Sequence, residues 1–219
     1  MPQNEGVIQF DLQYDPGPPM AAEVLRELNA WRRILWLLGL TGQDPARYAG
    51  FAYGNVSARR GPAERSRSRR PFVISGTQTG GLPELGRHHF ALVTSCDPAA
   101  NRVTAAGPIR PSSEALTHGA LYALDAKLGC VLHVHAPLLW QRAAALGLPV
   151  TAPTAAYGTR AMAEEVARLY ADPEVRRKGI IAMGGHEDGL VSFGPSVERA
   201  GTVLVQTLAR ALAEQGIRD

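Results

Sequence analysis

Helical and strand-like segments follow one another in this chain without the strict alternation of a parallel α/β fold. Apolar residues at three- and four-residue steps predict a first helix that Gly39 or Gly42 ends: Leu25, Leu28, Trp31, Leu35 and Leu38. Two β-prone pieces, 51–58 and 71–75, then predict a pair of strands. This mixture predicts an α/β fold, a layered single domain with a sheet that is at least partly antiparallel.

The rest of the chain continues the mixture. Further strands are predicted at 90–94, 102–106, 130–135, 179–183 and 190–193. Further helices are predicted from Ser112 or Ser113 to Lys127, through Trp140 to Gly147, at 162–170 and at 197–215. Since no repeat or linker divides the chain, we expect residues 21–219 to form one domain after an N-terminal extension of residues 1–20.

The composition supports a globular core and excludes one class of carbonyl chemistry. The chain has 219 residues, of which 45% are hydrophobic and 20% charged. Only two of its 23 basic residues are lysines, Lys127 at a predicted helix end and Lys178 in a polar run. A Schiff-base mechanism needs a lysine that can lose its proton in a pocket, and arginine cannot replace it. If this chain handles carbonyl compounds, it must polarise them in another way.

The cysteines and the N-terminal residues indicate the cellular compartment of the protein. Cys96 and Cys130 form no CxxC pair, and reduced thiols in a cytoplasm are the expectation. Residues 1–13 lack the basic and apolar regions of a signal peptide, and the apolar run 34–38 is too short to span a bilayer. We therefore expect a cytoplasmic protein with no membrane partner.

The strongest local signal for chemistry is His133-Val134-His135 in a predicted strand. Alternate residues of a strand point to one face, so the two imidazoles lie on the same side, about 6–7 Å apart along the strand. Such a pair can converge on one divalent ion, and zinc or a similar transition metal favours imidazole ligands. Two histidines that only form hydrogen bonds at the edge of a core are the alternative.

His186 is a third candidate ligand. It lies in the glycine-rich turn 184–189 between two predicted strands, where glycine permits close backbone approach. Three histidines that leave one position open are typical of a catalytic zinc site. A histidine that merely occupies a β-turn is the alternative.

Glu114 follows Pro111-Ser112-Ser113 at a predicted helix start. A carboxylate there can cap the helix, but a helix start with two hydroxyls is also suited to binding an anion. His118 lies four residues further on the same face. It can orient the carboxylate, act as a fourth metal ligand or do neither, and we favour a supporting role behind the ligands.

Two turns are candidate anion cradles. Gly54-Asn55-Val56-Ser57 and Thr77-Gln78-Thr79-Gly80-Gly81 combine glycine with small hydroxyl or amide side chains, and backbone N–H groups in such turns bind phosphate oxygens. The same residues are also ordinary turn formers. The segment 59–70 contains six arginines and one glutamate but no aromatic residue, so we expect a solvated connection and no nucleic-acid partner.

Taken in order, these motifs resemble the class II aldolase/adducin family, and the segment Pro153–Arg160 is also similar to that family. The resemblance covers most of the chain and implies a largely antiparallel central sheet flanked by helices. It further implies a homo-oligomer, usually a tetramer, with active sites at subunit contacts. Zn²⁺, or another divalent transition metal, is implied on His133, His135 and His186, with Glu114 as the catalytic acid/base. The residues implied to hold a substrate phosphate are Asn55, Thr79, Gly80, Ser112 and Ser113.

The activity that the resemblance implies is that of a zinc-dependent aldolase. Such a retro-aldol lyase cleaves a carbon–carbon bond in a small hydroxy-ketone or sugar, with or without a phosphate group, through a metal-stabilised enediolate. A pentulose-phosphate 4-epimerase, a dehydratase and a decarboxylase remain alternatives on the same metal site. Epimerases of this type usually carry Asp where this chain has Glu114, which favours the aldolase.

A non-catalytic, adducin-like interaction domain is the alternative from a different class. Such domains have lost metal ligands, whereas this chain retains all three candidate histidines. Two departures from the family pattern affect the substrate. Glu187 and Asp188 stand between His186 and Gly189, and Ala52 replaces a common phosphate-binding threonine. A substrate that ends in a carboxylate or a free hydroxyl is therefore an alternative to a phosphorylated one.

Overall fold

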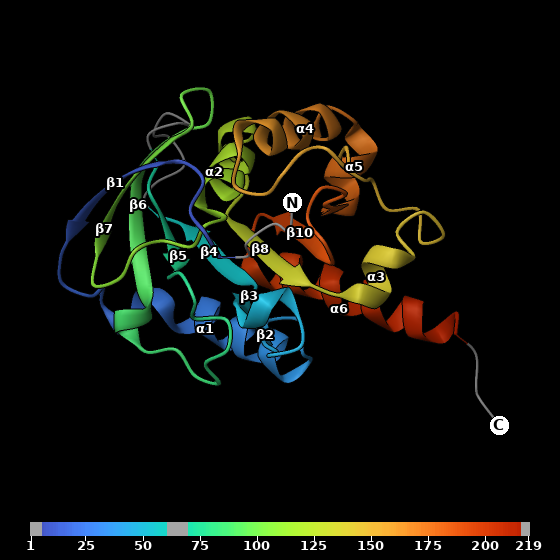
Figure 1. Ribbon diagram of the computed structural model, residues 1–219, viewed down its shortest axis with the longest axis horizontal. Helices are drawn as coiled ribbons and strands as arrows, with labels where there is room; N and C mark the ends of the chain where they lie inside the picture. The colour runs from blue at the N-terminus through green and yellow to red at the C-terminus, as the bar shows by residue number, and fades with distance from the viewer. Residues whose placement is uncertain (1–5, 61–69, 216–219) are drawn as a thin grey trace.

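The computed structural model describes residues 6–60 and 70–215. An eight-stranded sheet forms its centre, in the order β1-β7-β6-β5-β4-β8-β10-β9 (Figure 1). The strands are β1 (Asp11–Pro16), β4 (Asn55–Arg59), β5 (Phe72–Ser75), β6 (Phe90–Asp97), β7 (Arg102–Gly107), β8 (Cys130–His135), β9 (Ile180–Ala182) and β10 (Gly189–Gly194). Neighbouring strands are antiparallel except β1 and β7. The layered domain with a largely antiparallel sheet is thereby confirmed.

Helices cover both faces of this sheet (Figure 1). One face packs against α1 (Ala22–Leu37), α3 (Pro137–Gln141) and α6 (Val197–Ala213). The other packs against α2 (Ala115–Leu124), α4 (Arg160–Tyr170) and α5 (Pro173–Lys178). A short ribbon of β2 (Gly42–Gln43) and β3 (Ala52–Tyr53) lies outside the main sheet.

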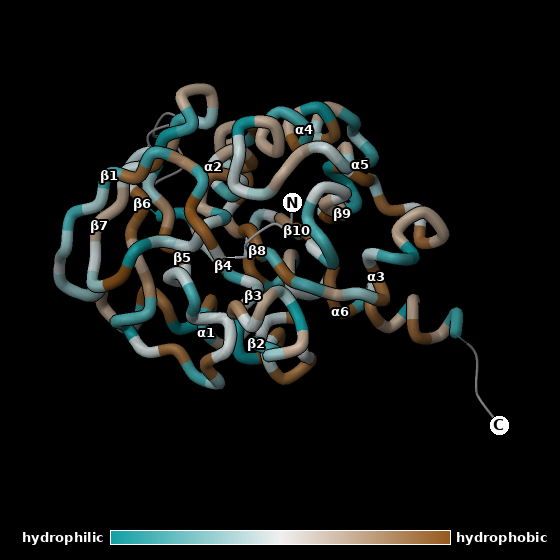
Figure 2. The backbone as a smooth tube through the Cα atoms, viewed as in Figure 1, coloured by the Kyte–Doolittle hydropathy of each residue, from teal (hydrophilic) through white to brown (hydrophobic). Residues whose placement is uncertain are grey.

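The two apolar cores follow from the alternation of side chains along the strands. Leu132 and Val134 of β8 pack in the core with α1 and α6, whereas Val131 packs in the core with α2 and α4. In Figure 2, hydrophilic and hydrophobic segments alternate along α4 and α5, as expected for helices with one face on the core. The side chains of His133 and His135 therefore lie on the α2/α4 side of the sheet.

The predicted helix from Ser112 or Ser113 to Lys127 is shorter in the structure. Glu114 occupies the N-cap position, where the Ser112 hydroxyl accepts a hydrogen bond from the Glu114 N–H at 3.3 Å. The helix ends at Leu124, and arginine side chains bond to carbonyls around its end: Arg59 donates to Tyr122 and Asp125, and Arg70 donates to Ala126. These side chains come from the two ends of the arginine-rich segment, and residues 61–69 between them lie outside the described chain.

Two other helices differ from the sequence prediction. The helix expected through Trp140 to Gly147 is α3, which ends at Gln141 and continues as turns. The polar run 173–178 forms α5, which was not predicted. Asp172 caps α5 through a hydrogen bond from the Glu174 N–H at 2.8 Å, and Gly179 ends it in a left-handed conformation.

Strand β1 lies within the expected N-terminal extension. It pairs in parallel with β7 over residues 11–16, and the Gly17 N–H then donates to the Gly107 carbonyl at 2.9 Å. Leu12 and Tyr14 pack against the core beside α2. This part of the extension is thus an edge of the central sheet.

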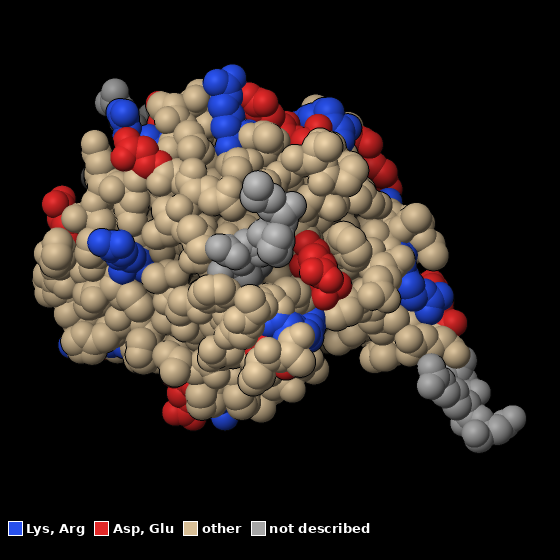
Figure 3. All heavy atoms as spheres, in the orientation of Figure 1, with Lys and Arg blue, Asp and Glu red and all other residues tan. Residues whose placement is uncertain are grey.

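The cysteines and lysines lie in different environments. Cys96 and Cys130 are free thiols, and burial raises the pKa of Cys96 to about 12. Lys127 is exposed, while Lys178 donates to the Gly147 carbonyl at 2.7 Å. On the face drawn in Figure 3, acidic and basic side chains are interspersed and lie mainly toward the rim. Within residues 6–60 and 70–215, no helix has both the length and the apolar character needed to cross a bilayer.

Candidate metal centre

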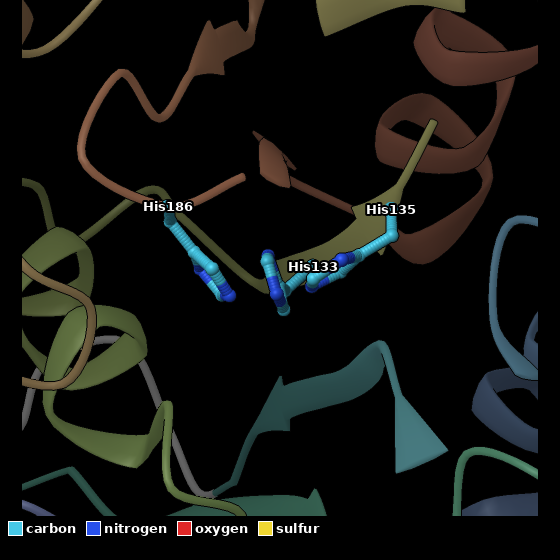
Figure 4. Close-up of side chains that lie close together, drawn as sticks. All are labelled: His133, His135 and His186. Atoms are coloured by element: carbon cyan, nitrogen blue, oxygen red, sulfur yellow. The ribbon is translucent and has the colours of Figure 1, made fainter. Parts of the chain in front are cut away.

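Three buried histidines converge at the end of β8 (Figure 4). His133 and His135 belong to this strand, and His186 lies in the turn before β10. One nitrogen from each ring lies within 4.8 Å of the corresponding nitrogens of the other two. The ring centroids are 4.7–5.0 Å apart, and each residue is at most 2% exposed. The structure thus brings together all three predicted metal ligands.

Burial keeps this cluster in the form that binds metals. Loss of hydration, and next the neighbouring His186, lower the pKa values of His133 and His135 well below the ordinary range. The Nδ1–H of His133 donates to the Leu190 carbonyl at 3.1 Å, which leaves the Nε2 lone pair available. Within the described chain this Nε2 is buried with no hydrogen-bond partner. Neutral imidazoles with such a nitrogen fit a divalent transition metal such as zinc.

The turn before β10 fixes His186 by close packing. The His186 N–H donates to the Met183 carbonyl, and the Gly189 N–H donates to the His186 carbonyl. A Cβ at Gly185 would lie 2.0 Å from the Ala155 carbonyl oxygen, so only glycine allows this approach. The His186 ring stacks on Tyr157, with centroids 4.7 Å apart.

Glu114 lies against this cluster from the start of α2. Its carboxylate oxygen Oε1 is 3.3 Å from Nδ1 of His186, and the residue is 1% exposed. The group that could hold a metal consists of the three histidines, so Glu114 stands next to the site. A carboxylate at this place can orient the imidazole and reach a molecule bound in the centre.

His118 lies one turn further along α2 and is fully buried. Its Nδ1 is 2.7 Å from the Ser57 hydroxyl, which is also 2.8 Å from the Tyr122 hydroxyl. Its Nε2 has no hydrogen-bond partner in the described structure. The predicted supporting role behind the metal ligands remains a proposal.

The buried His118 predicts a pH effect on the stability of the metal-free protein. Burial lowers its pKa from 6.5 to about 3, so below pH 6.5 the unfolded chain binds a proton that the folded chain does not. The free energy of unfolding should therefore decrease as the pH is lowered below about 6.5, by about 1.4 kcal/mol per pH unit for each such histidine. In His118→Gln this dependence should be shallower by about one proton, measured by urea unfolding between about pH 6.5 and 4.5. An unchanged slope would contradict the assignment.

The five residues predicted to bind phosphate line one small pocket beside the cluster. These residues are Asn55, Thr79, Gly80, Ser112 and Ser113. Asn55 pairs with His133 across β4 and β8, and its Oδ1 is buried without a hydrogen-bond partner in the described chain. Since Ser112 and Ser113 directly precede Glu114, the pocket adjoins the carboxylate. This arrangement suits the anionic or polar end of a small molecule.

The turn that carries Thr79 and Gly80 is held by a residue that sequence reasoning missed. Arg32 of α1 is 2% exposed, and its guanidinium donates to the carbonyls of Thr79 at 2.9 Å, Gly80 at 2.8 Å and Pro83 at 3.3 Å. Burial and the adjacent Arg33 lower its pKa to about 10. A polar residue among the apolar positions of the first helix was the available sequence signal.

We expect Arg32→Met to lower the free energy of unfolding by about 3 kcal/mol. The substitution leaves the carbonyls of Thr79 and Gly80 without their donor in a region that water reaches poorly, while the Pro83 carbonyl still accepts a hydrogen bond from Arg33. Arg26→Met is the matched control, because this arginine of the same helix is exposed. Urea unfolding should show less than about 1 kcal/mol for the control, and equal losses would contradict the role of Arg32.

A second group missed from the sequence borders His135. The Tyr48 ring lies 4.5 Å from the His135 ring, and the Tyr48 hydroxyl donates to the Asp188 carboxylate at 2.7 Å. Arg47 forms an ion pair with the same carboxylate oxygen at 3.3 Å. Burial, and next the bond to Asp188, raise the pKa of Tyr48 above its ordinary value. Asp188 is thus engaged by Arg47 and Tyr48, while Glu187 is exposed.

Comparison with known protein families identifies one family whose sequence pattern covers most of this chain. The model of the family described as Class II Aldolase and Adducin N-terminal domain matches residues 46–213. Comparison with curated protein sequences finds no significant match.

Solved structures with a similar fold include an L-fuculose 1-phosphate aldolase, with a TM-score of 0.63, 17% identity and coverage of 90% of this chain and 89% of that one. L-fuculose-1-phosphate aldolase from Thermus thermophilus has a TM-score of 0.61 and 16% identity, covering 91% of this chain and 100% of that one. YgbL from Escherichia coli has a TM-score of 0.60 and 17% identity, covering 87% of both chains. At identities of 16–17%, these similarities show a shared fold and carry no conclusion about activity.

Proposed function

The chain belongs to the class II aldolase and adducin family, and from this premise we propose that it is a zinc-dependent aldolase. The observation that carries the proposal is the buried cluster of His133, His135 and His186 with Glu114 against it. A complete set of candidate ligands also favours an enzyme over a non-catalytic interaction domain. The substrate class is a small hydroxy-ketone or sugar, with or without a phosphate group.

The residues of the chain divide the work of cleaving a carbon–carbon bond. A divalent metal on the three histidines would supply positive charge that stabilises a developing oxyanion, for which no lysine is needed. Glu114 moves the proton at the reacting carbon, since its carboxylate is buried beside the cluster. Tyr157 packs on His186 and holds that ring in place.

The pocket next to Glu114 positions the other end of the substrate. The hydroxyls of Ser112 and Ser113, the Asn55 amide and the Thr79–Gly80 turn form a polar lining suited to a phosphate group. Ala52 also lines this pocket and contributes no hydroxyl. A terminal carboxylate or hydroxyl is the alternative occupant, and a substrate screen separates the three.

The proposal also covers the cellular compartment and the oligomeric state of the enzyme. We assign it to the cytoplasm, which the two free thiols support, and to a homo-oligomer, with the tetramer that the family resemblance implies. Active sites at subunit contacts would then add residues from a neighbouring copy to the pocket.

A screen of aldols with and without a phosphate group, read by release of the aldehyde product, tests this function. Chelation should abolish the activity, and zinc should restore it. Zinc at about 1,000 times its Kd should also raise the Tm of the metal-free protein by about 10 °C, because it binds only the folded state. Metal below about a tenth of an equivalent per chain, not recovered on zinc addition, would refute the enzyme assignment.

A further inference from the structure

A second cavity lies at the β9 edge of the sheet, away from the histidines. It has a volume of about 320 Å³ and lies between the end of α5, β9, α6 and the turns that follow α3. Its basic lining residues are Arg177, Lys178, Arg199 and Arg210. We propose that this basic cavity is a binding site for a small phosphorylated metabolite, distinct from the metal centre.

The alternation of side chains separates the two sites. Ile180 of β9 and Val203 of α6 line the cavity and belong to the core that contains Val134 of β8. His133 and His135 alternate with Val134 and therefore point to the other face of the sheet. None of the residues that line the basic cavity belongs to the histidine cluster or to the small pocket beside it.

The charge in this cavity is largely uncompensated. Its lining contains no Asp or Glu among the described residues, and only Arg177 pairs with a carboxylate, that of Glu174 outside the cavity. The Lys178 amine donates to the Gly147 carbonyl at 2.7 Å, and Arg210 donates to the Leu146 carbonyl. Arg199 donates to the Arg177 carbonyl at 3.3 Å. Carbonyls fix these side chains but do not neutralise them, so several positive charges remain for a ligand.

The chemistry of the lining selects the class of ligand. Arginine guanidinium groups bind phosphate oxygens in pairs, and a lysine adds a point charge, so the set favours a multivalent anion. The apolar floor of Leu146, Leu148, Ile180 and Val203 offers contact to a short carbon body. The volume is at the lower end of the range for small-molecule sites. A phosphate monoester of a small sugar or polyol satisfies all three properties.

Calorimetric titration with glycerol 3-phosphate tests the proposal. We expect binding to the wild type and to His133→Ala, because this site does not rest on the metal centre or on the aldolase assignment. In the His133→Ala background, Arg199→Gln with Arg210→Gln should weaken binding by at least about tenfold. Arg26→Gln with Arg87→Gln is the matched control, since it removes the same charge from exposed positions elsewhere. The control should bind within about twofold of its parent.

Chemical modification of arginines in the wild-type protein provides a second test, which does not depend on whether the double variant folds. Glycerol 3-phosphate should protect Arg199 and Arg210 from phenylglyoxal, read by mass spectrometry, while Arg26 and Arg87 react as before. The proposal is overturned by absence of binding at about 10 mM, by an equal loss in the control, or by unprotected Arg199 and Arg210. Loss of binding in His133→Ala alone would place the ligand at the metal centre and would also overturn it.

Discussion

Glu114→Gln is expected to reduce turnover by about 10²–10⁴-fold while leaving the metal content unchanged. Glutamine keeps the shape of the side chain and an oxygen that can accept a hydrogen bond from His186, but it cannot move a proton. The three histidines remain in place, because Glu114 adjoins their group without belonging to it. Activity and metal content, measured on the same preparation, separate the two roles.

Glu187→Gln is the matched control for this variant. Glu187 belongs to the turn that carries His186, but its side chain is exposed. We expect its activity to stay within about twofold of wild type, because exposed charges contribute little. Retained activity in Glu114→Gln would show that Glu114 is not the acid/base, and loss of metal there would show that it acts as a ligand.

His133→Ala is expected to lose both metal and activity. The substitution removes a buried nitrogen that lies within 4.8 Å of the other ligand atoms, and two histidines bind zinc much more weakly than three. Bound zinc should fall below about a tenth of an equivalent per chain, measured after gel filtration. Zinc should then no longer raise the Tm of the protein.

His88→Ala serves as the control, because His88 is exposed and distant in sequence from the cluster. It should keep wild-type metal content and activity. A His133→Ala protein that still binds one equivalent of zinc with wild-type affinity would show that the metal lies elsewhere.

Local patterns predicted much of the sheet and of the metal site. The strand at 130–135 could be read from its apolar residues and from Pro137, and its two-residue period placed both histidines on one face. His186 was a candidate because it lies in a glycine-rich turn between two predicted strands, where the backbone can approach closely and loops often hold ligands. The strand pairing places this turn beside the end of β8, since Gly189 pairs with His135.

Interactions between distant segments were beyond such patterns. Arg32 resembles any polar residue on a helix until the turn at 79–83 is placed over it. Tyr48 comes beside His135 through backbone with positive φ at Tyr48 and Ala49, which no glycine signals at those positions. Likewise, the carbonyls just after the end of α2 bond to Arg59 and Arg70, which come from another segment. In each case a tertiary contact decided what local propensity left open.

The two margins of the central sheet bear on how copies of this chain can associate. At one margin the outermost strand, β1, presents Asp11, Asp15 and Pro16, and β9 at the other margin has only three residues. The residues at 149–151 also bond to Ala182 of β9 and occupy its open side. The charged residues and proline of β1, and the short length and covered side of β9, all oppose pairing of edge strands between copies into a continuous sheet. We therefore expect subunits that assemble to meet through helices and loops, so that the sheet of each copy ends at its own edge strands.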